Sequence, residues 1–323
     1  MRRKIIIDTD PGVDDAMAIR FALASPHLDL LGLTTVFGNV PVELTTTNAL
    51  RLLETAGRPD IPVAKGAANP LVGMFGGGVP FVHGDDGQGN TFRPVPSGRP
   101  VALPAAAFLV EQVRTYPQQV TLIAIGPLTN LAQALTLDPS IAEQVGEVVI
   151  MGGNAFCSGN ATPAAEANVL ADPDAADLVL GAGWPITMIG LDVTHQVNLT
   201  NAQIAQLADV PGPLNALVSA MVPFYQSFYE RVNKIDGIYV HDSSAVAYVL
   251  APHLFTCKRY PVRVDTSRGI GRGKTWPSIG ESDHEGGEAL RPWLNRPLVN
   301  VAVAVDGPAV IDLMLRTIQE QQA

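Results

Sequence analysis

The chain has 323 residues, of which 47% are hydrophobic and 16% charged, so it can form a thick core and is not a largely disordered protein. Its formal net charge of -10 argues against a dedicated nucleic-acid-binding protein, because phosphate backbones are bound by lysine and arginine. The apolar run at residues 5–7 is too short for a signal peptide or a membrane span, and the two cysteines, Cys157 and Cys257, lack zinc-site spacing. We therefore expect a cytoplasmic protein without nucleic-acid or membrane partners.

Short β-branched runs alternate with longer amphipathic segments, a pattern typical of a mostly parallel sheet covered by helices. Predicted strands cover residues 4–7, 30–36, 120–125, 148–151 and 185–190, and predicted helices cover residues 14–24, 44–56 and 174–180. Asp172 should cap the last of these helices, with Pro173 in its first turn, and a final helix should open at 306–308 and run through 315. The expected fold class is α/β, a Rossmann-like open fold with a mostly parallel central sheet flanked by helices.

Residues 66–104 and 265–296 are rich in glycine and proline and hold few apolar runs. Irregular segments of this length inside a compact domain are usually functional or mobile. No composition break marks a linker, and no internal repeat is present. We therefore expect a single domain over residues 1–323.

Four aspartates cluster near the start of the chain. Asp8 and Asp10 end the first predicted strand, a Pro-Gly turn follows, and Asp14 and Asp15 fall in the first turn of the next helix. Ligands of open parallel sheets bind at the carboxyl ends of strands, and four carboxylates there repel one another unless protons or a cation neutralise them. Oxygen ligands select calcium or magnesium. The alternative is that these residues only cap the turn and favour the helix N-terminus, which is a poor explanation for all four.

Residues 8–16, Asp-Thr-Asp-Pro-Gly-Val-Asp-Asp-Ala, resemble the N-terminal signature of the inosine-uridine-preferring nucleoside hydrolase family. Further motifs of that family follow in order to about residue 250: Gly38-Asn39, His83-Gly84-Asp85-Asp86-Gly87, Gly126-Pro127-Leu128-Thr129-Asn130, Met151-Gly152-Gly153, Glu166-Ala167-Asn168 and His241-Asp242. The resemblance implies a calcium-dependent enzyme that hydrolyses the N-glycosidic bond of ribonucleosides to ribose and free base. It also implies a homodimer or homotetramer.

The same resemblance implies a ligand set for Ca²⁺: Asp10, Asp15, Asp242 and the backbone carbonyl of Ile125. Calcium is a weak Lewis acid, so a neighbouring carboxylate should take the proton of the attacking water, and Asp10 is the candidate general base. The implied ribose contacts are Asp14, Asn39, Asn160, Glu166 and Asn168, with Met151 packing under the sugar. Ordinary loop chemistry is the alternative for Asn160 and Asn168, and core packing is the alternative for Met151.

The departing base needs a proton, and His241, next to Asp242, is the candidate donor because histidine titrates near working pH. A structural histidine at a helix start is the alternative. His83, in the glycine-rich segment, would close over the base. Tyr225 and Tyr229 lie on one helical face and would either stack on a base or pack in the core. With His241 they favour acceptance of purines as well as pyrimidines.

Two positions depart from the family pattern. Ala167 stands where many members carry an aromatic residue, and Gln88 replaces an aliphatic one, so both are expected to affect base preference. His195 follows a predicted strand and receives no role beyond structure. The segment at residues 271–275, Gly-Arg-Gly-Lys-Thr, is not a P-loop, because Arg268 stands where that motif requires glycine.

Two other functions stay open on the sequence. A haloacid-dehalogenase-like magnesium phosphatase also begins with a strand and Asp-x-Asp, although residues 11–15 do not match its usual continuation. A nucleoside-binding protein without turnover would not need both a base and an acid, which Asp10 and His241 supply. A dinucleotide-binding dehydrogenase is excluded, because no GxGxxG follows the first strand and aspartates stand where a pyrophosphate would bind.

Overall fold

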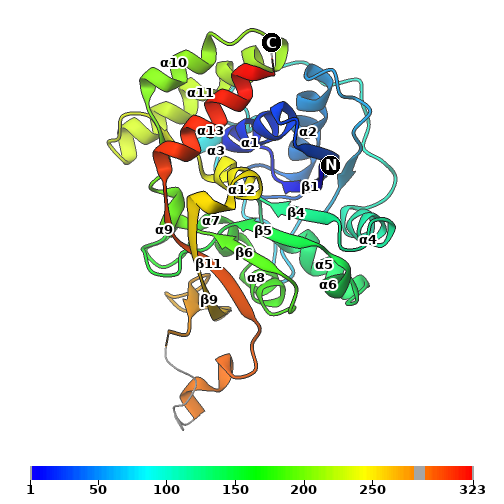
Figure 1. The fold of residues 1–323 in the computed structure, drawn as a ribbon, viewed down its shortest axis with the longest axis vertical. Helices are drawn as coiled ribbons and strands as arrows, with labels where there is room; N and C mark the ends of the chain where they lie inside the picture. Colours follow the sequence, from blue (N-terminus) through cyan, green and yellow to red (C-terminus); the bar gives the residue numbers. More distant parts are fainter. Residues whose placement is uncertain (1, 280–287, 322–323) are drawn as a thin grey trace.

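A nine-stranded sheet runs through the computed structural model, which describes residues 2–279 and 288–321. Its order is β10-β9-β11-β6-β5-β4-β1-β2-β3, and Figure 1 labels β1, β4, β5, β6, β9 and β11. The parallel part consists of β1 (Arg3–Thr9), β2 (Leu28–Thr35), β3 (Val63–Lys65), β4 (Val120–Ala124), β5 (Glu147–Met151) and β6 (Ile186–Ile189). The expectation of a mostly parallel central sheet is confirmed.

The central strand β1 is buried on both faces, which is why it reads as a continuous apolar run. Ile5 and Ile7 point into one core and Ile6 into the other, as the alternation of side chains along a strand requires. Burying both faces needs helices on each side of the sheet.

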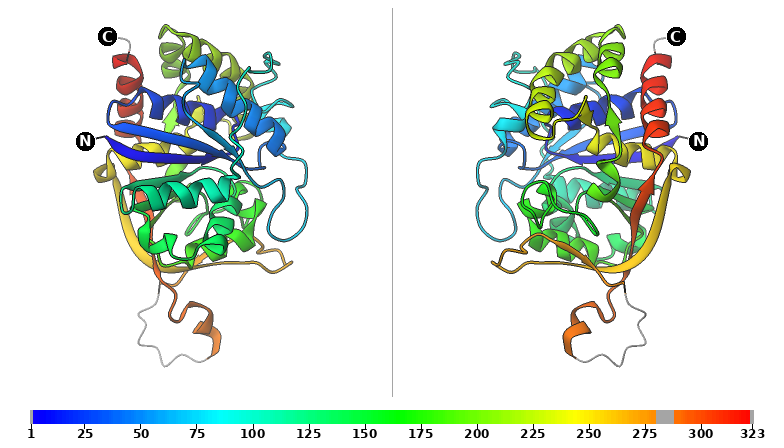
Figure 2. Two further views of the ribbon diagram at one scale, coloured as in Figure 1. Left: turned by 90° about the vertical axis from the view of Figure 1, so that its right-hand side faces the viewer. Right: turned by 90° about the vertical axis from the view of Figure 1, so that its left-hand side faces the viewer.

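Helices cover the sheet in two layers, which Figure 2 shows above and below its edge. The layer that packs on Ile5 and Ile7 contains α1 (Val13–Ala24), α2 (Val42–Thr55), α10 (Asn201–Ala208), α11 (Pro213–Val232), α12 (His241–Leu250) and α13 (Gly307–Glu320). The layer on Ile6 contains α4 (Ala105–Thr115), α5 (Thr129–Leu137), α6 (Ile141–Gln144) and α8 (Pro173–Leu180). No helix in the described ranges is long and apolar enough to cross a membrane.

The predicted strands and the first three predicted helices agree with the structure to within two residues at each end. Asp172 caps α8 as predicted, since its carboxylate accepts a hydrogen bond from the Ala175 N–H at 3.0 Å. The last helix continues to Glu320, five residues beyond the predicted end at Leu315.

The antiparallel edge of the sheet is absent from the predictions. It consists of β9 (Phe255–Val264), β10 (Thr275–Pro277) and β11 (Leu298–Val305), of which β11 pairs in parallel with β6 and antiparallel with β9. β9 carries exposed lysine and arginine at an outer position of the sheet, so it lacks the apolar run that marks the central strands. The stretch 265–296, expected to be irregular, contains β10 and the short helix η2 (Glu288–Trp293), and its residues 280–287 lie outside the described ranges.

The chain reverses its direction of winding at β1, because β2 and β3 lie on one side of this strand and β4 to β6 on the other. In open α/β sheets a ligand-binding crevice forms at the carboxyl ends of the strands beside such a switch point. Asp10 directly follows β1, and Ile125 directly follows β4. The topology therefore brings these two positions to the same crevice.

Candidate active site

A pocket of about 340 Å³ opens at this crevice. Its walls include most of the side chains that the sequence pointed to: Asp14, Asn39, His83, Ile125, Met151, Asn160, Glu166, Asn168, Tyr225, Tyr229, His241 and Asp242. Asp10 and Asp15 do not line the open space, because both are fully buried beneath it. The fold thus brings together residues from across the chain around one cavity.

Three carboxylates form a compact cluster at the floor of the pocket. Asp14 and Asp15 lie in the first turn of α1, and Asp242 in the first turn of α12. Each offers an oxygen, and these oxygens all lie within 4.8 Å of one another. All three residues are buried, so their charges are poorly screened by water.

Asp10 is outside that group of three but adjoins it. Its Oδ2 accepts a hydrogen bond from the Asn39 N–H at 2.7 Å, while its buried Oδ1 has no hydrogen-bond partner among the described residues. A Cβ at Gly38 or at Gly126 would clash with this carboxylate. The Gly-Asn and Gly-Pro motifs therefore carry glycine where the Asp10 side chain needs space.

Burial raises the pKa of every carboxyl group in the cluster. The pKa of Asp14 rises to about 6 through burial, and that of Asp15 rises to about 6 through burial and then the charge of Asp14. The pKa values of Asp10 and Asp242 are raised well above the ordinary value, again mainly by burial and then by neighbouring aspartates. Such a set of crowded oxygen donors suits a hard divalent cation, which would replace the protons.

Asp15 combines two roles that the sequence analysis set against each other. It accepts hydrogen bonds from the Gly12 N–H at 2.9 Å and from the Thr9 hydroxyl at 2.5 Å, so it does cap the start of α1. Asn39 Nδ2 also donates to its carboxylate at 3.0 Å and thereby ties it to Asp10. Its Oδ1 also accepts from the Asp10 N–H at 3.2 Å, so each oxygen accepts two hydrogen bonds and the carboxylate is fixed in place beside Asp10.

The opposite wall carries Met151, Glu166 and Asn168. Asn168 Nδ2 donates to the carbonyls of Ile125 at 3.0 Å and Met151 at 3.2 Å. The Glu166 carboxylate caps α7 (Ala167–Ala171) by accepting from the N–H groups of Asn168 and Val169. Asn160 is exposed at the rim, where its Oδ1 accepts from the Ala167 N–H at 3.0 Å. Hydrogen bonds to the backbone of the loop and to the start of α7 therefore hold these side chains in place within the pocket.

Residues 271–275, the segment that does not form a P-loop, hold the loop before Glu166 in place. Lys274 Nζ donates to the carbonyls of Asn154 and Cys157, the latter at 3.1 Å. Thr275 Oγ1 accepts from the Asn154 N–H at 2.9 Å. Asp192 accepts from the N–H groups of residues 155 and 156, each at 2.7 Å. Lys274 thus satisfies carbonyls that the irregular loop leaves without backbone partners.

A chain of hydrogen bonds runs from the acidic cluster to His241. The Tyr225 hydroxyl donates to Asp14 Oδ2 at 3.1 Å and lies 3.1 Å from the Tyr229 hydroxyl. The Tyr229 hydroxyl lies 3.0 Å from His241 Nε2, and His241 Nδ1 lies 2.8 Å from Thr194 Oγ1. Both tyrosines are buried, and His83 already stacks on Tyr225 with 5.2 Å between ring centroids. The two phenols therefore contribute hydroxyl groups to this chain.

The expectation that His241 titrates near working pH is wrong. Burial, followed by the charges of His195 and His83, lowers its pKa to about 3, so the ring is neutral at pH 7. His83 is likewise buried in α3 (Pro80–His83), where burial lowers its pKa to about 4. Its Nδ1 accepts from the Val13 N–H at 3.2 Å. Both histidines line the pocket as neutral rings.

Several pocket residues were not predicted. His195 lines the pocket with its ring centroid 5.5 Å from that of His241, although it was given no role. Phe81 and Phe228 stand at the mouth with 6.2 Å between ring centroids, and Phe81 is 62% exposed. No local pattern marks Phe81 or Phe228, because their proximity arises from the fold.

The two departures from the family pattern differ in position. Ala167 lines the pocket, as expected of a residue that affects base preference. Gln88 does not line it: the side chain is fully buried, and its Oε1 accepts a hydrogen bond from Arg51 at 2.7 Å. Any effect of Gln88 on base preference is therefore indirect.

Comparisons with known proteins show the family of the chain. The family model for "Inosine-uridine preferring nucleoside hydrolase" matches residues 5–312. "Probable uridine nucleosidase 2" of Arabidopsis thaliana is 44% identical, covering 99% of this chain and 98% of its own length. "Inosine-uridine preferring nucleoside hydrolase" of Leishmania major is 39% identical, covering 85% and 87%.

Two solved structures have the same fold over almost their whole length. A plant nucleoside hydrolase matches with a TM-score of 0.94 at 40% identity, covering 99% of both chains. A purine-preferring ribonucleoside hydrolase from Gardnerella vaginalis matches with a TM-score of 0.90 at 34% identity, again covering 99% of both. The chain therefore belongs to the inosine-uridine-preferring nucleoside hydrolase family and is an enzyme of the N-glycosyl hydrolase class.

Proposed function

We propose that this enzyme hydrolyses ribonucleosides to ribose and free base with the help of a bound Ca²⁺ ion. The observation that carries the proposal is the arrangement of one pocket, with an acidic cluster at its floor and a tyrosine–histidine chain along its wall. The first suits a cation and an attacking water, and the second suits a departing base. Neither a haloacid-dehalogenase-like phosphatase nor a nucleoside-binding protein without turnover would need both the acidic cluster and the tyrosine–histidine chain.

The donor set supports calcium as the cation. We assign it to Asp10, Asp15, Asp242 and the carbonyl of Ile125, with Asp14 close enough to take part. These are oxygen donors only, they include a backbone carbonyl, and Oδ1 of Asp10 is buried without a partner among the described residues. When bound, the cation would lower the pKa of a coordinated water and hold the ribose hydroxyls.

Asp10 acts as the general base in this scheme. Its Oδ1 is available to accept a proton from the attacking water, while its Oδ2 is fixed by the Asn39 N–H. The water oxygen then forms the bond to the anomeric carbon of the ribose. The bond to the base breaks, and its electron pair leaves with the base.

The ribose develops positive charge as that bond breaks, as in other glycoside hydrolyses. Carboxylate and amide oxygens around the sugar would stabilise this charge. The residues that we assign to the ribose are Asp14, Asn39, Asn160, Glu166 and Asn168, with Met151 beneath it. Glu166 and Asn168 also hold the loop that carries them, so their replacement would disturb both binding and local structure.

His241 donates the proton that the departing base needs. Because its ring is neutral, it would act through an N–H group rather than as an imidazolium. The Tyr229 and Tyr225 hydroxyls connect this ring to Asp14 through hydrogen bonds and thereby hold it in place beside the base. His83, stacked on Tyr225, would contact the base from the same side.

We further propose that the enzyme accepts purine as well as pyrimidine nucleosides. A base with a poor leaving tendency gains most from a proton donor, and His241 with its two tyrosines provides one. The named relatives include uridine nucleosidases, an inosine-uridine-preferring hydrolase and a purine-preferring one, so their names alone do not fix the preference. A homodimer or homotetramer, a cytoplasmic location and a single domain over residues 1–323 stay predictions.

A product assay separates this function from the phosphatase alternative. The enzyme is incubated with inosine, uridine or a generic phosphomonoester in phosphate-free buffer, and free base, reducing sugar and inorganic phosphate are measured. We expect equal amounts of base and reducing sugar from the nucleosides and no phosphate. Phosphate release without base release would overturn the proposal, and so would nucleoside binding without any product.

A further inference from the structure

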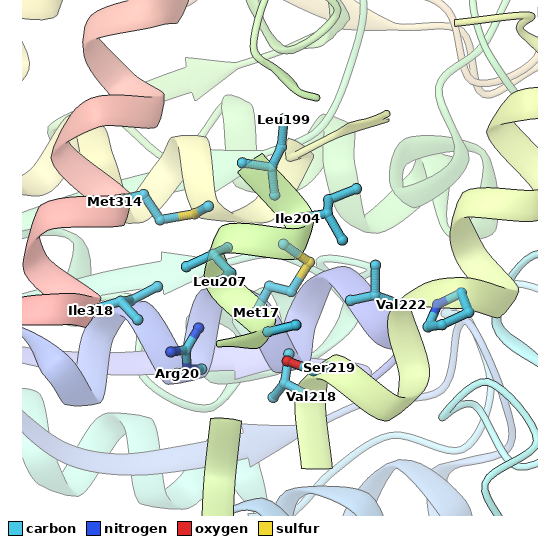
Figure 3. Close-up of a pocket in the computed structure, with 12 residues that line it drawn as sticks. Met17, Arg20, Leu199, Ile204, Leu207, Val218, Ser219, Val222, Met314 and Ile318 are labelled. Carbon is cyan, nitrogen blue, oxygen red and sulfur yellow. The ribbon is translucent and has the colours of Figure 1, made fainter. Parts of the chain in front are cut away.

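A second, smaller pocket lies in the helical layer on one side of the sheet, away from the acidic cluster. It has a volume of about 130 Å³ and is enclosed by α1, α10, α11, α13 and the short strand β7 (Asn198–Leu199) (Figure 3). Apolar side chains form most of its wall, among them Met17, Leu207, Val222 and Met314. The mechanism above uses none of these residues.

Arg20 is the only charged residue among the described residues that line this wall. It is 6% exposed, and among the described residues no carboxylate or carbonyl forms an ion pair or hydrogen bond with its guanidinium group. Arg263 and Arg296 make a useful contrast, since both are partly buried and both pair with Asp177. Shielding a guanidinium from most of its water without an anion is costly, and its nitrogens stay accessible from the pocket, so Arg20 is a cation without a partner among the described residues.

The neighbouring helix adds polar groups to the same wall. Pro223 lies inside α11, and because proline has no N–H, the carbonyl of Ser219 has no donor four residues later. Ser219 itself lines the pocket, with its hydroxyl drawn beside Val218 in Figure 3. The pocket is thus apolar apart from one guanidinium and one serine.

We propose that this pocket binds a small aliphatic monocarboxylate, with the carboxylate on the guanidinium of Arg20 and the carbon chain between Met17, Leu207 and Met314. A carboxylate matches the guanidinium fork in shape and neutralises a single positive charge, whereas a phosphate dianion would need further cationic partners. The apolar walls suit a hydrocarbon chain.

The volume sets the size of the ligand. A buried cavity of roughly 150 Å³ takes up a molecule the size of benzene, so about six carbon atoms fit here. Hexanoate is therefore a suitable probe. Hexan-1-ol has the same chain without the charge, and hexylammonium carries the opposite charge.

Methionine methyl groups report on the two pockets separately. Met17 and Met314 line the small pocket, and Met151 lines the active-site pocket. With ¹³C-methyl-labelled methionine, we expect hexanoate to shift the NMR signals of Met17 and Met314, to leave that of Met151 in place, and to bind with a dissociation constant below about 1 mM. Uridine should do the reverse, so the result does not depend on the proposed catalytic mechanism.

Two leucine variants test the role of the charge. In Arg20→Leu, hexanoate affinity should fall by about tenfold or more, because the charge-assisted pair is lost while the apolar wall remains. Arg316→Leu, an exposed position on α13, controls for general attraction of anions and should bind as the wild type does. Hexan-1-ol and hexylammonium should bind the wild type at least about tenfold more weakly than hexanoate.

Three results would overturn the proposal. One is that the NMR signals of Met17 and Met314 do not shift at about 10 mM hexanoate, a concentration roughly tenfold above the largest dissociation constant that we expect. Another is equal binding of hexanoate to the wild type and to a folded Arg20→Leu variant. The third is equal binding of hexan-1-ol and hexanoate. This would mean that the pocket binds apolar molecules without using the guanidinium group.

Discussion

The hydroxyl of Tyr229 lies 3.0 Å from Nε2 of His241. Through the Tyr225 hydroxyl, this contact extends to Asp14 in the acidic cluster. The residue proposed to protonate the base is therefore linked by hydrogen bonds to the carboxylates proposed to hold the cation.

Tyr229→Phe removes the hydroxyl that contacts both Tyr225 and His241 and leaves the ring in place. We expect kcat for inosine to fall by about tenfold or more, and a substrate with a good leaving group, such as p-nitrophenyl riboside, to lose much less. Steady-state kinetics on both substrates measures the difference. Tyr239→Phe is the matched control, because Tyr239 contacts the rings of Tyr229 and His241 but no hydrogen bond of its hydroxyl is described. Equal losses on both substrates would argue against proton donation.

Asp10→Asn keeps the size of the side chain and removes the general base. We expect turnover of every nucleoside to fall by about a hundredfold or more, the scale of a lost acid or base, and Ca²⁺ affinity to fall as well. Kinetics and calorimetric titration with Ca²⁺ provide the two readouts. A variant that turns over at close to the wild-type rate would show that another group takes the proton.

Burial raises the pKa of Asp8 to about 7 from 3.8. A raised pKa means that the folded state favours the neutral form of Asp8. The contribution of Asp8 to the free energy of unfolding is therefore fully present below about pH 4 and is lost as the pH rises through 7. His83 and His241, with lowered pKa values, act in the opposite direction. Comparison with Asp8→Asn removes their effect, since both proteins contain them.

In the presence of chelator, we therefore expect Asp8→Asn to gain stability relative to the wild type between pH 5 and pH 8. Each pKa unit corresponds to roughly 1.4 kcal/mol, so the relative gain should reach a few kcal/mol. Urea unfolding at several pH values measures it. A difference between the two proteins that does not vary with pH would mean that Asp8 is ionised throughout.

Lys274→Met removes the ammonium group from the carbonyls of Asn154 and Cys157. The loop that carries Asn160 and Glu166 then loses part of its support, so we expect KM for uridine to rise by about tenfold with a smaller change in kcat. Lys274→Arg should recover part of the loss, and Lys258→Met, at an exposed position on β9, should behave as the wild type does. A purely global destabilisation would instead lower the melting temperature and leave KM unchanged.

The parallel part of the fold and the acidic cluster could be predicted because their signals are local. β1 reads as a buried strand from three consecutive isoleucines, and these are followed within a few residues by Asp8, Asp10, Asp14 and Asp15. The family motifs then supplied Asp242 and Ile125. The fold brings Asp10 and Ile125 to one crevice, because β1 and β4 end at the same edge of the sheet. Asp242 reaches it from the first turn of α12, which packs against α1.

The rest could not be predicted because it depends on contacts between distant residues. Tyr225 and Asp14 are 211 positions apart, and Thr194 reaches His241 across 47. The lowered pKa of His241 follows from its burial, which no local pattern encodes. The strand β9 has two exposed charged residues in succession, Lys258 and Arg259, and no clear alternation. Its pairing with β11 needs partners some 40 positions away, as in Tyr260 with Val299.

Measuring the release of free base with and without the bound metal tests the central claim most directly. Inosine, uridine, adenosine and cytidine are incubated in phosphate-free buffer with untreated enzyme, with chelator-treated enzyme, and with treated enzyme to which Ca²⁺ is returned. We predict base release that disappears on chelation and returns with calcium. Base release that is unaffected by a chelator which removes the bound metal would contradict the assignment of the aspartate cluster as a cation site.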